Sequence, residues 1–504
     1  MSRAGVAAGW IALLLTVAGV RLAVIDRPFA TNDEGTAAGI PLMTALNYHR
    51  YGIGAHRLAG VLNAGDVPVE NRVLYAHHPP TVPVLIALTY DAWGVAEWTS
   101  RLFPAICSVL ATLLLGWMIA RRHGHPAGIA AAGCYALCPM TIAFGDMPDF
   151  VAAPLVLMAL LTVECFARFL ETSQARWLGW GALAFVGGAL VDWPIFFLPP
   201  ILALVWMRGA TWRRWWRVLP FALGCGIVLA LLIAWTAYAD PAGAIWEQIT
   251  ARIAGTHDQT GQRIPMSDWL WRVGIEYQLI RQGAIALLAL AYLLLRPRQR
   301  ADVPLMLLGW GALHLLIAYQ GNYQHSFWSI VVTPGLAAAA GVVIGRLLEF
   351  RLPAPAAISG AVTIPILLGL LHWPTARHEL YDDYAYVRAV PYSQRELADA
   401  IRSVAAPHEG VLTSDSVWSP ALWFYADRQL RPVVRNPETF DQCLDHPHYL
   451  LPFNYFQPSG PPPRWFVLPD FDRPNVPALA ARLEASFPPM RVGRFAIYDL
   501  GREK

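Results

Sequence analysis

Charged residues are scarce in this sequence of 504 residues. Asp, Glu, Lys and Arg make up only 14% of it, hydrophobic residues make up 56%, and the mean hydropathy is +0.40. Soluble domains carry about a quarter charged residues, and apolar runs close to the ~20 residues that cross a bilayer recur along this chain. These features exclude an ordinary soluble protein and predict a polytopic membrane protein.

Lysine is nearly absent, and paired cysteine motifs are lacking. The only lysine is Lys504, and the six cysteines show neither a disulfide framework nor zinc-ligand spacing. The net charge of +3 is too small to suggest nucleic acid as a partner. No internal repeat is apparent, whereas an inverted-repeat transporter would be expected to show one at least weakly.

Arginine clusters set the predicted topology. They fall on one face of the expected spans, and the positive-inside rule makes that face cytoplasmic. We therefore expect a multi-pass protein of the cytoplasmic membrane, with its N-terminus inside and its C-terminus outside. The apolar stretch 79–98 is expected to be a re-entrant or interfacial helix within the first external loop. The expected spans, about eleven, lie near residues 4–25, 101–120, 127–145, 150–170, 177–192, 194–207, 218–238, 279–295, 303–319, 327–347 and 355–372.

Two polar regions are predicted outside the membrane. The first is the external loop 26–100, which contains a candidate amphipathic helix from Thr36 to Tyr51. The second begins near His372, where the sequence becomes charged and rich in proline. Residues 1–372 are thus expected to form the transmembrane domain, and residues 373–504 an external α/β domain. Its expected elements are helices at 393–404 and 476–486 and strands at 411–414, 465–468 and 492–500.

Acidic and histidine residues from distant parts of the chain converge on the predicted external face. Charge at the end of a membrane span is costly and often functional, so this convergence predicts a site. The converging residues are Asp33-Glu34, His77-His78, Asp146 with Asp149, His257-Asp258 and Gln324-His325.

Structural roles compete with this interpretation at several positions. Either Asp146 or Asp149 can N-cap the next span. Glu34 can be a solvated charge near a helix N-terminus, and His77 can be a solvated loop residue. Asp192, at the external end of another span, is interpreted as a cap.

Several short motifs follow one another in a distinctive order. They are Asp33-Glu34, His78-Pro79-Pro80, Arg101-Leu102-Phe103-Pro104, Met147-Pro148-Asp149, and His325-Ser326-Phe327-Trp328 followed by Thr333-Pro334-Gly335-Leu336. This order resembles the GT-C glycosyltransferases, particularly the bacterial relatives of protein O-mannosyltransferases and of the lipid A aminoarabinose transferase. The resemblance covers roughly residues 1–375 and departs at Thr36, where relatives often carry Arg.

The resemblance implies a GT-C fold and an inverting enzyme that works at the external face of the membrane. Its donor would be a sugar on a polyprenyl phosphate, and its acceptor a lipid, a polysaccharide or a protein. An acceptor hydroxyl needs a positioned base, and a partly dehydrated carboxylate has the raised pKa that such a base needs. The growing charge on the leaving phosphate must be matched by cations or a metal.

These requirements assign expected roles to the candidate residues. Asp33 is expected to be the base, with Glu34 and Asp149 as further catalytic residues. The expected substrate-binding residues are His77, His78, Asp146, His325 and Arg272. A divalent metal (Mg, Mn or Zn) is a candidate cofactor, with Glu34, His78 and His325 as possible ligands.

Two other classes of function stay open on the sequence alone. The first is a transporter or flippase for a lipid-linked saccharide, which would use the same external polar cluster. The second is a non-catalytic membrane anchor that presents the C-terminal region to a partner. The missing repeat disfavours the transporter, and the anchor leaves the Asp33 and His78 clusters unexplained.

Overall fold

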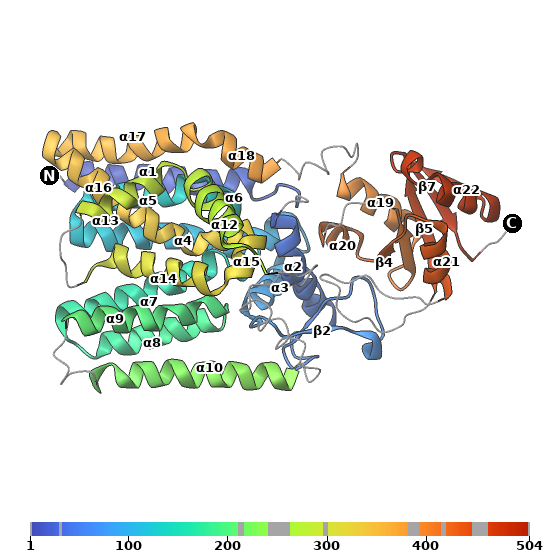
Figure 1. The fold of residues 1–504 in the computed structure, drawn as a ribbon, viewed down its shortest axis with the longest axis horizontal. Helices are drawn as coiled ribbons and strands as arrows, with labels where there is room; N and C mark the ends of the chain where they lie inside the picture. The colour runs from blue at the N-terminus through green and yellow to red at the C-terminus, as the bar shows by residue number, and fades with distance from the viewer. Residues whose placement is uncertain are drawn as a thin grey trace. The chain divides into compact units, whose positions relative to one another are not determined.

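The computed structural model describes residues 3–29, 33–209, 216–239, 263–295, 301–381, 393–414, 420–445 and 462–501 (Figure 1). The chain divides into two compact units. The first unit contains Met1–Pro28 and Ala76–Tyr381, and the second contains Phe29–Tyr75 and Asp382–Lys504.

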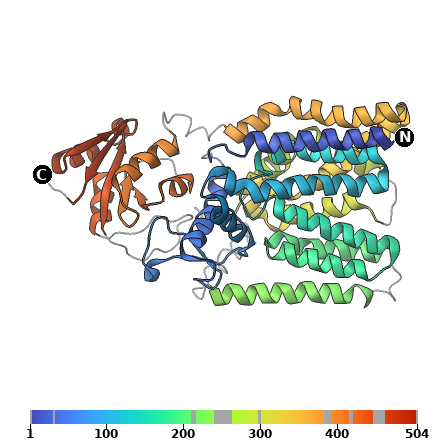
Figure 2. The same cartoon turned by 180° about the vertical axis from the view of Figure 1, so that it is seen from behind.

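The first unit is a bundle of helices, most of them long and roughly parallel (Figures 1 and 2). Short 3₁₀ helices at Trp193–Phe197 and Ser326–Val331 and a π-helix at Leu270–Ile280 complete it. Its α-helices are α1 (Arg3–Val24), α3 (Thr81–Trp93), α4 (Glu97–His123), α5 (His125–Leu137), α6 (Pro139–Phe144), α7 (Ala153–Thr172), α8 (Arg176–Ala189), α9 (Leu198–Gly209), α10 (Leu219–Ala239), α12 (Met266–Trp269), α13 (Ala284–Leu295), α14 (Val303–Ile317), α15 (Tyr319–Gln324), α16 (Thr333–Arg351), α17 (Ala354–Leu371) and α18 (Trp373–Tyr381).

Each expected span coincides with a helix, but the count of about eleven membrane crossings is not confirmed. Among the described residues, six helices are long and apolar enough to cross a membrane, namely α1, α4, α7, α10, α16 and α17. The helices over 266–280 and 284–295 are bent by 97° and would add a seventh if they form one span. The expected span 127–145 is broken at Cys138 into α5 and α6. These helices indicate a multi-pass membrane protein.

Small residues form a close helix contact between α5 and α16 in the first unit. Gly341 and Gly345 lie four residues apart on α16 and face Ala127 and Ala131 of α5. A Cβ added at either glycine would come within 2.6 Å of a backbone atom of α5. Such small-xxx-small pairs let helix backbones approach closely where lipid offers no hydrophobic driving force between helices.

The second unit combines a five-stranded sheet with helices and with residues 29–75. The strand order is β4-β3-β5-β7-β6, with β3 parallel to β4 and β5, and β7 antiparallel to β5 and β6. A short 3₁₀ helix spans Val69–Asn71, and another spans Arg473–Asn475. The remaining elements are α2 (Asp33–Tyr51), β1 (Gly60–Val61), β2 (Leu74–Tyr75), α19 (Gln394–Val404), β3 (Gly410–Thr413), α20 (Pro420–Ala426), β4 (Gln429–Val433), α21 (Pro437–Asp445), β5 (Pro463–Pro469), α22 (Pro477–Ser486), β6 (Pro489–Val492) and β7 (Phe495–Asp499).

Apolar side chains from the sheet and from two helices form the core of this α/β fold. Phe440 of α21 and Leu479 and Leu483 of α22 are fully buried with Phe466 of β5 and Tyr498 of β7. Phe440 meets the ring of Phe466 edge-on at 5.7 Å. The expected α/β character of the C-terminal region is therefore seen in its described residues.

The contacts group the chain differently from a simple division at residue 372. Residues 29–75, which belong to the loop expected to be external, cluster with the C-terminal region, and the second unit resumes at Asp382. The expected helix Thr36–Tyr51 is present as α2 and begins three residues earlier, at Asp33. A helix is present in 79–98 as α3, and its expected re-entrant or interfacial position stays a prediction. The short helix expected at 244–253 lies outside the described residues.

Candidate functional site

A histidine–aspartate pair joins two distant parts of the first unit. His78 Nδ1 lies 2.7 Å from Asp192 Oδ1, and because a carboxylate can only accept, Nδ1 donates. The imidazole also stacks on the ring of Phe150, with centroids 4.4 Å apart and planes within 8°. The aspartate fixes the imidazole at one edge, and the aromatic ring fixes one of its faces.

The local fold of Asp192 explains how it reaches His78. Asp192 precedes the 3₁₀ helix Trp193–Phe197, and its Oδ1 accepts a hydrogen bond from Trp193 N at 2.7 Å. The capping role expected for Asp192 is therefore confirmed, and the same oxygen also holds His78. Its other oxygen, Oδ2, is buried and has no hydrogen-bond partner among the described residues. Trp193 Nε1 donates to the carbonyl of His77 at 2.5 Å, which draws the same two segments together.

Asp149 is a buried acid that directly precedes Phe150, the residue that stacks on His78, and it interacts electrostatically with Asp192. Asp149 Oδ1 accepts a hydrogen bond from Val151 N at 2.9 Å, and Asp149 is only 5% exposed. Burial, with a smaller contribution from the charge of Asp192, raises the pKa of Asp149 to about 8, although the backbone hydrogen bonds oppose this rise. Two neighbouring carboxyl groups in a dry site do not both ionise readily. Asp149 is thus protonated at neutral pH.

Asp146 lies only three residues away but in a different environment. Arg27 binds it with two hydrogen bonds, at 2.8 Å to Oδ2 and 3.2 Å to Oδ1, and Arg21 Nη1 lies 3.7 Å from Oδ1. All three side chains are buried. Burial alone would raise the pKa of Asp146, but the two guanidinium groups lower it overall. A bidentate arginine pair of this kind fixes geometry as well as charge.

The expectation that Asp146 or Asp149 caps the next span is wrong. The N-cap residue of α7 is Ala152, and no side chain caps that helix. Asp146 instead connects two segments, because it lies just after α6 and binds Arg27, which lies just after α1. Arg101, which is fully buried at the start of α4, also binds the segment after α1. It donates to the carbonyls of Ile25 and Arg27, at 3.1 and 2.5 Å.

Two further candidates of the first unit, His325 and Arg272, contact aromatic residues. His325 precedes the 3₁₀ helix Ser326–Val331 and packs against the rings of Phe327 and Trp328, at 5.4 and 5.7 Å. Arg272 lies in the π-helix, donates to Tyr277 Oη at 2.6 Å and stacks over the Tyr323 ring at 4.9 Å.

The side chains of Asp33 and Glu34 lie outside the described residues, although the backbone places both in the first turn of α2. Among the residues that the structure does describe, no three His, Cys, Asp or Glu side chains come together as metal ligands would. Because Glu34 is one of the possible ligands, the divalent metal stays a prediction.

The sequence motifs single out His78 and Asp149 as candidates but do not indicate three residues that contact this region. Asp192 is predicted from the sequence only as a cap, and neither Arg27 nor Arg101 is predicted as a partner of Asp146 or of the chain after α1. The Arg101-Leu102-Phe103-Pro104 motif was a usable signal, since a charged residue at the start of a span needs a partner.

One family model matches part of this chain. A family model described as dolichyl-phosphate-mannose-protein mannosyltransferase matches residues 77–238, which is less than half of the chain. The matched stretch contains His78, Asp146, Asp149 and Asp192. No curated protein sequence matches the chain significantly.

Solved structures resemble the chain over nearly its whole length. ArnT from Cupriavidus metallidurans bound to undecaprenyl phosphate superimposes with a TM-score of 0.65 and 16% identity, covering 97% of this chain and 98% of that one. The apo form of the same protein gives 0.61 and 14%, covering 98% of each chain. The archaeal oligosaccharyltransferase AglB from Archaeoglobus fulgidus, in complex with an inhibitory peptide and a dolichol-phosphate, gives 0.55 and 12%, covering 97% and 74%. The expected GT-C fold is therefore confirmed.

Proposed function

We propose that this protein is a membrane glycosyltransferase that moves a sugar from a polyprenyl-phosphate carrier to an acceptor at the external face of the cytoplasmic membrane. One observation carries the proposal most strongly. The fold matches, over 97% of this chain, that of an ArnT with undecaprenyl phosphate bound. The acceptor is a lipid, a polysaccharide or a protein, and membrane lipids surround the helices.

Inversion at the anomeric carbon follows from a single displacement. The acceptor hydroxyl attacks that carbon, its proton passes to the Asp33 carboxylate, and the bond to the phosphate oxygen breaks. The polyprenyl phosphate leaves with the electron pair of that bond. A positioned base contributes about 10²–10⁴-fold in such a step.

The described residues support a role in holding the leaving group. His78, oriented by Asp192 and Phe150, presents an imidazole of fixed direction. Asp149, neutral because its pKa is raised to about 8 by burial, can donate a hydrogen bond to a phosphate oxygen. A neutral acid is suited to this place because an ionised one would repel the phosphate. His77, Asp146, His325 and Arg272 stay proposed substrate-binding residues.

The test of the base is Asp33→Asn, which keeps the shape of the side chain but accepts no proton at working pH. We expect turnover with a polyprenyl-phosphate sugar to fall by at least ~100-fold while donor binding is retained. A thermal-shift measurement checks the folding of the variant. Near wild-type turnover would remove Asp33 as the base.

The reaction itself can be tested in cells. Mass spectrometry of membrane lipids and envelope glycans, with and without the gene, should show a polyprenyl-phosphate sugar that accumulates when the gene is deleted. The glycan that loses the sugar then identifies the acceptor. If the wild-type strain produces the protein and the deletion strain has the same lipids and glycans, the proposal is contradicted.

A further inference from the structure

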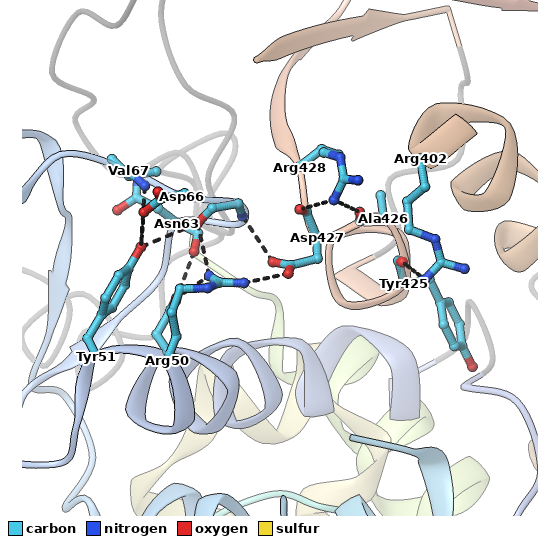
Figure 3. A network of polar contacts seen from close by, with 12 residues as sticks. Arg50, Tyr51, Asn63, Asp66, Val67, Arg402, Tyr425, Ala426, Asp427 and Arg428 are labelled. Atoms are coloured by element: carbon cyan, nitrogen blue, oxygen red, sulfur yellow. Dashed lines mark hydrogen bonds and ion pairs between the residues drawn. The ribbon is translucent and has the colours of Figure 1, made fainter. Parts of the chain in front are cut away.

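One carboxylate of the C-terminal region, that of Asp427, binds both the last turn of α2 and the loop that follows β1 (Figure 3). Its Oδ2 is ion-paired with Arg50 Nη2, and its Oδ1 accepts from Gly65 N at 3.1 Å. Arg50 also donates through Nη1 to Asn47 Oδ1 and to the Gly65 carbonyl, each at 2.9 Å. The side chains of Arg50 and Asp427 are 23% and 28% exposed, so water screens this pair only in part.

The backbone around this contact is adapted to a close approach. Asp427 follows α20 directly and has a φ of +45°, a left-handed conformation that aspartate and asparagine tolerate better than most residues. Gly65 has a φ of +76°, and a Cβ there would lie 2.4 Å from the Pro407 carbonyl. Asp66 N donates to that same carbonyl at 2.9 Å, and Gln429 Nε2 donates to the Asp66 carbonyl at 2.6 Å.

A second contact secures the chain just before α2. Phe29 N donates to Tyr425 Oη at 2.8 Å, and the Phe29 ring meets the Phe424 ring edge-on at 5.2 Å. All three side chains are buried. Tyr425 and Phe424 belong to α20, so this one short helix and the residue after it contact the chain on both sides of α2. We call this set of contacts the α2 clamp: Phe29 with Phe424 and Tyr425, and Arg50 with Asp427.

We propose that Arg50 and Asp427, through the α2 clamp, are positioning residues for Asp33 and Glu34, the two acids in the first turn of α2. This inference rests on the proposed function, in which Asp33 is the base. A base must lie within hydrogen-bond reach of the proton that it removes. Buried rings fix the chain just before α2, and an ion pair fixes its last turn. A helix that is fixed at both ends in this way keeps its first turn in one place. The C-terminal region is then part of the catalytic apparatus through α2.

A double-mutant cycle on the ion pair tests the proposal in the full-length protein. Asp427→Asn removes the charge but tolerates the left-handed backbone and keeps an oxygen for Gly65 N. Arg50→Gln removes the other charge. We expect each variant to lower kcat about 10-fold with an unchanged donor KM, within the ~100-fold that a misplacement of about 1 Å can cost. The double variant should be no worse than either single one, because both remove the same contact.

Hydrogen exchange of the backbone amides of α2 supplies a readout that does not depend on activity. Exchange over 33–51 should be faster in both single variants than in the wild type. The matched control is Arg491→Ala, which breaks an ion pair with Asp470 within the C-terminal region. It should change neither the exchange of α2 nor kcat.

The outcomes separate this inference from the proposed function. Unchanged exchange in α2, or losses of kcat that add in the double variant, would overturn the positioning role while leaving the transferase intact. Faster exchange with normal turnover would show that the clamp orders α2 without serving catalysis, and would also overturn it. A wild-type protein that transfers no sugar from any lipid phosphate would refute the proposed function, and the catalytic role of the clamp with it.

Discussion

Asp146 and Asp149 are buried three residues apart in one loop, and their surroundings give them opposite properties. Arg27 and Arg21 neutralise Asp146 and keep its pKa low, whereas no described cation accompanies Asp149, and burial raises its pKa to about 8. The first is therefore an anion that ties α1 to α6. The second is a neutral acid beside the His78–Asp192 pair. Residue type and position in the loop do not distinguish them, but their ionic partners do.

The largest effect is expected when the ion-paired member loses its charge. Asp146→Ala should lower the free energy of unfolding by about 3–5 kcal/mol, because it leaves the buried charges of Arg27 and Arg21 uncompensated. Thermal unfolding in detergent and the yield of folded protein measure this loss. Asp149→Asn, the matched control, should fold with near-normal yield. Equal stability of the two variants would erase the distinction between the two acids.

A smaller effect, visible through its pH dependence, is expected for Asp149. Its pKa is about 8 in the folded protein and near 3.8 when unfolded. Between these values the folded state binds more protons, so stability falls as pH rises towards 8, by at most about 1.4 kcal/mol per pH unit. Asp149→Asn cannot ionise and should lose this slope. The measurement is the unfolding temperature of both proteins from pH 6 to pH 8.

Parallel pH profiles for wild type and Asp149→Asn would mean that Asp149 is already ionised at pH 6. Its proposed hydrogen bond to a phosphate oxygen would then be wrong. If the acid is needed in its neutral form, activity should also decline as the pH rises through about 8, the pKa of Asp149. The Asp149→Asn variant should keep donor binding above that pH, since an amide still donates.

The sequence predicted those parts of the fold that depend on local pattern. Apolar runs located the helices, and Ser393 with Glu396 forms the expected capping box, with Glu396 N donating to Ser393 Oγ at 3.1 Å. Strand β4 was missed because Gln429–Val433 contains Gln, Arg and Pro rather than an apolar run. The expected strand 492–500 is present as β7 (Phe495–Asp499) and begins three residues later, because the chain turns at Gly493, whose φ is +56°, between β6 and β7.

The candidate site was predictable only as far as single residues. His78 and Asp149 were identified by motif, but the partners that define their chemistry are remote in sequence. Asp192 lies 114 residues from His78, and Arg27 lies 119 residues from Asp146. A single sequence carries no signal for such pairings. The predicted capping role of Asp192 is correct but incomplete, because the same carboxylate oxygen accepts hydrogen bonds from both Trp193 N and His78.

The smallest effect is expected for a substitution of Asp192, which tests whether the hydrogen bond from His78 matters for donor binding. Asp192→Asn keeps an oxygen for Trp193 N but replaces the charge that orients His78. A hydrogen bond of this kind contributes about 0.5–1.5 kcal/mol net, so binding of a short polyprenyl phosphate should weaken about 2–10-fold. Turnover of bound donor should change little, since His78 acts in the ground state as well as in the transition state. Isothermal titration calorimetry measures the binding.

A cycle with His78→Ala and a control at another cap decide how that result is interpreted. His78→Ala should weaken binding at least as much as Asp192→Asn, and the double variant should match His78→Ala, because Asp192 acts only through the imidazole. Asp302 also caps a helix, accepting from Leu305 N at 3.1 Å, and receives Tyr292 Oη at 2.6 Å. Asp302→Asn should therefore lower stability without changing donor affinity. If Asp192→Asn behaves in the same way, Asp192 is a structural cap, and His78 is oriented by Phe150 alone.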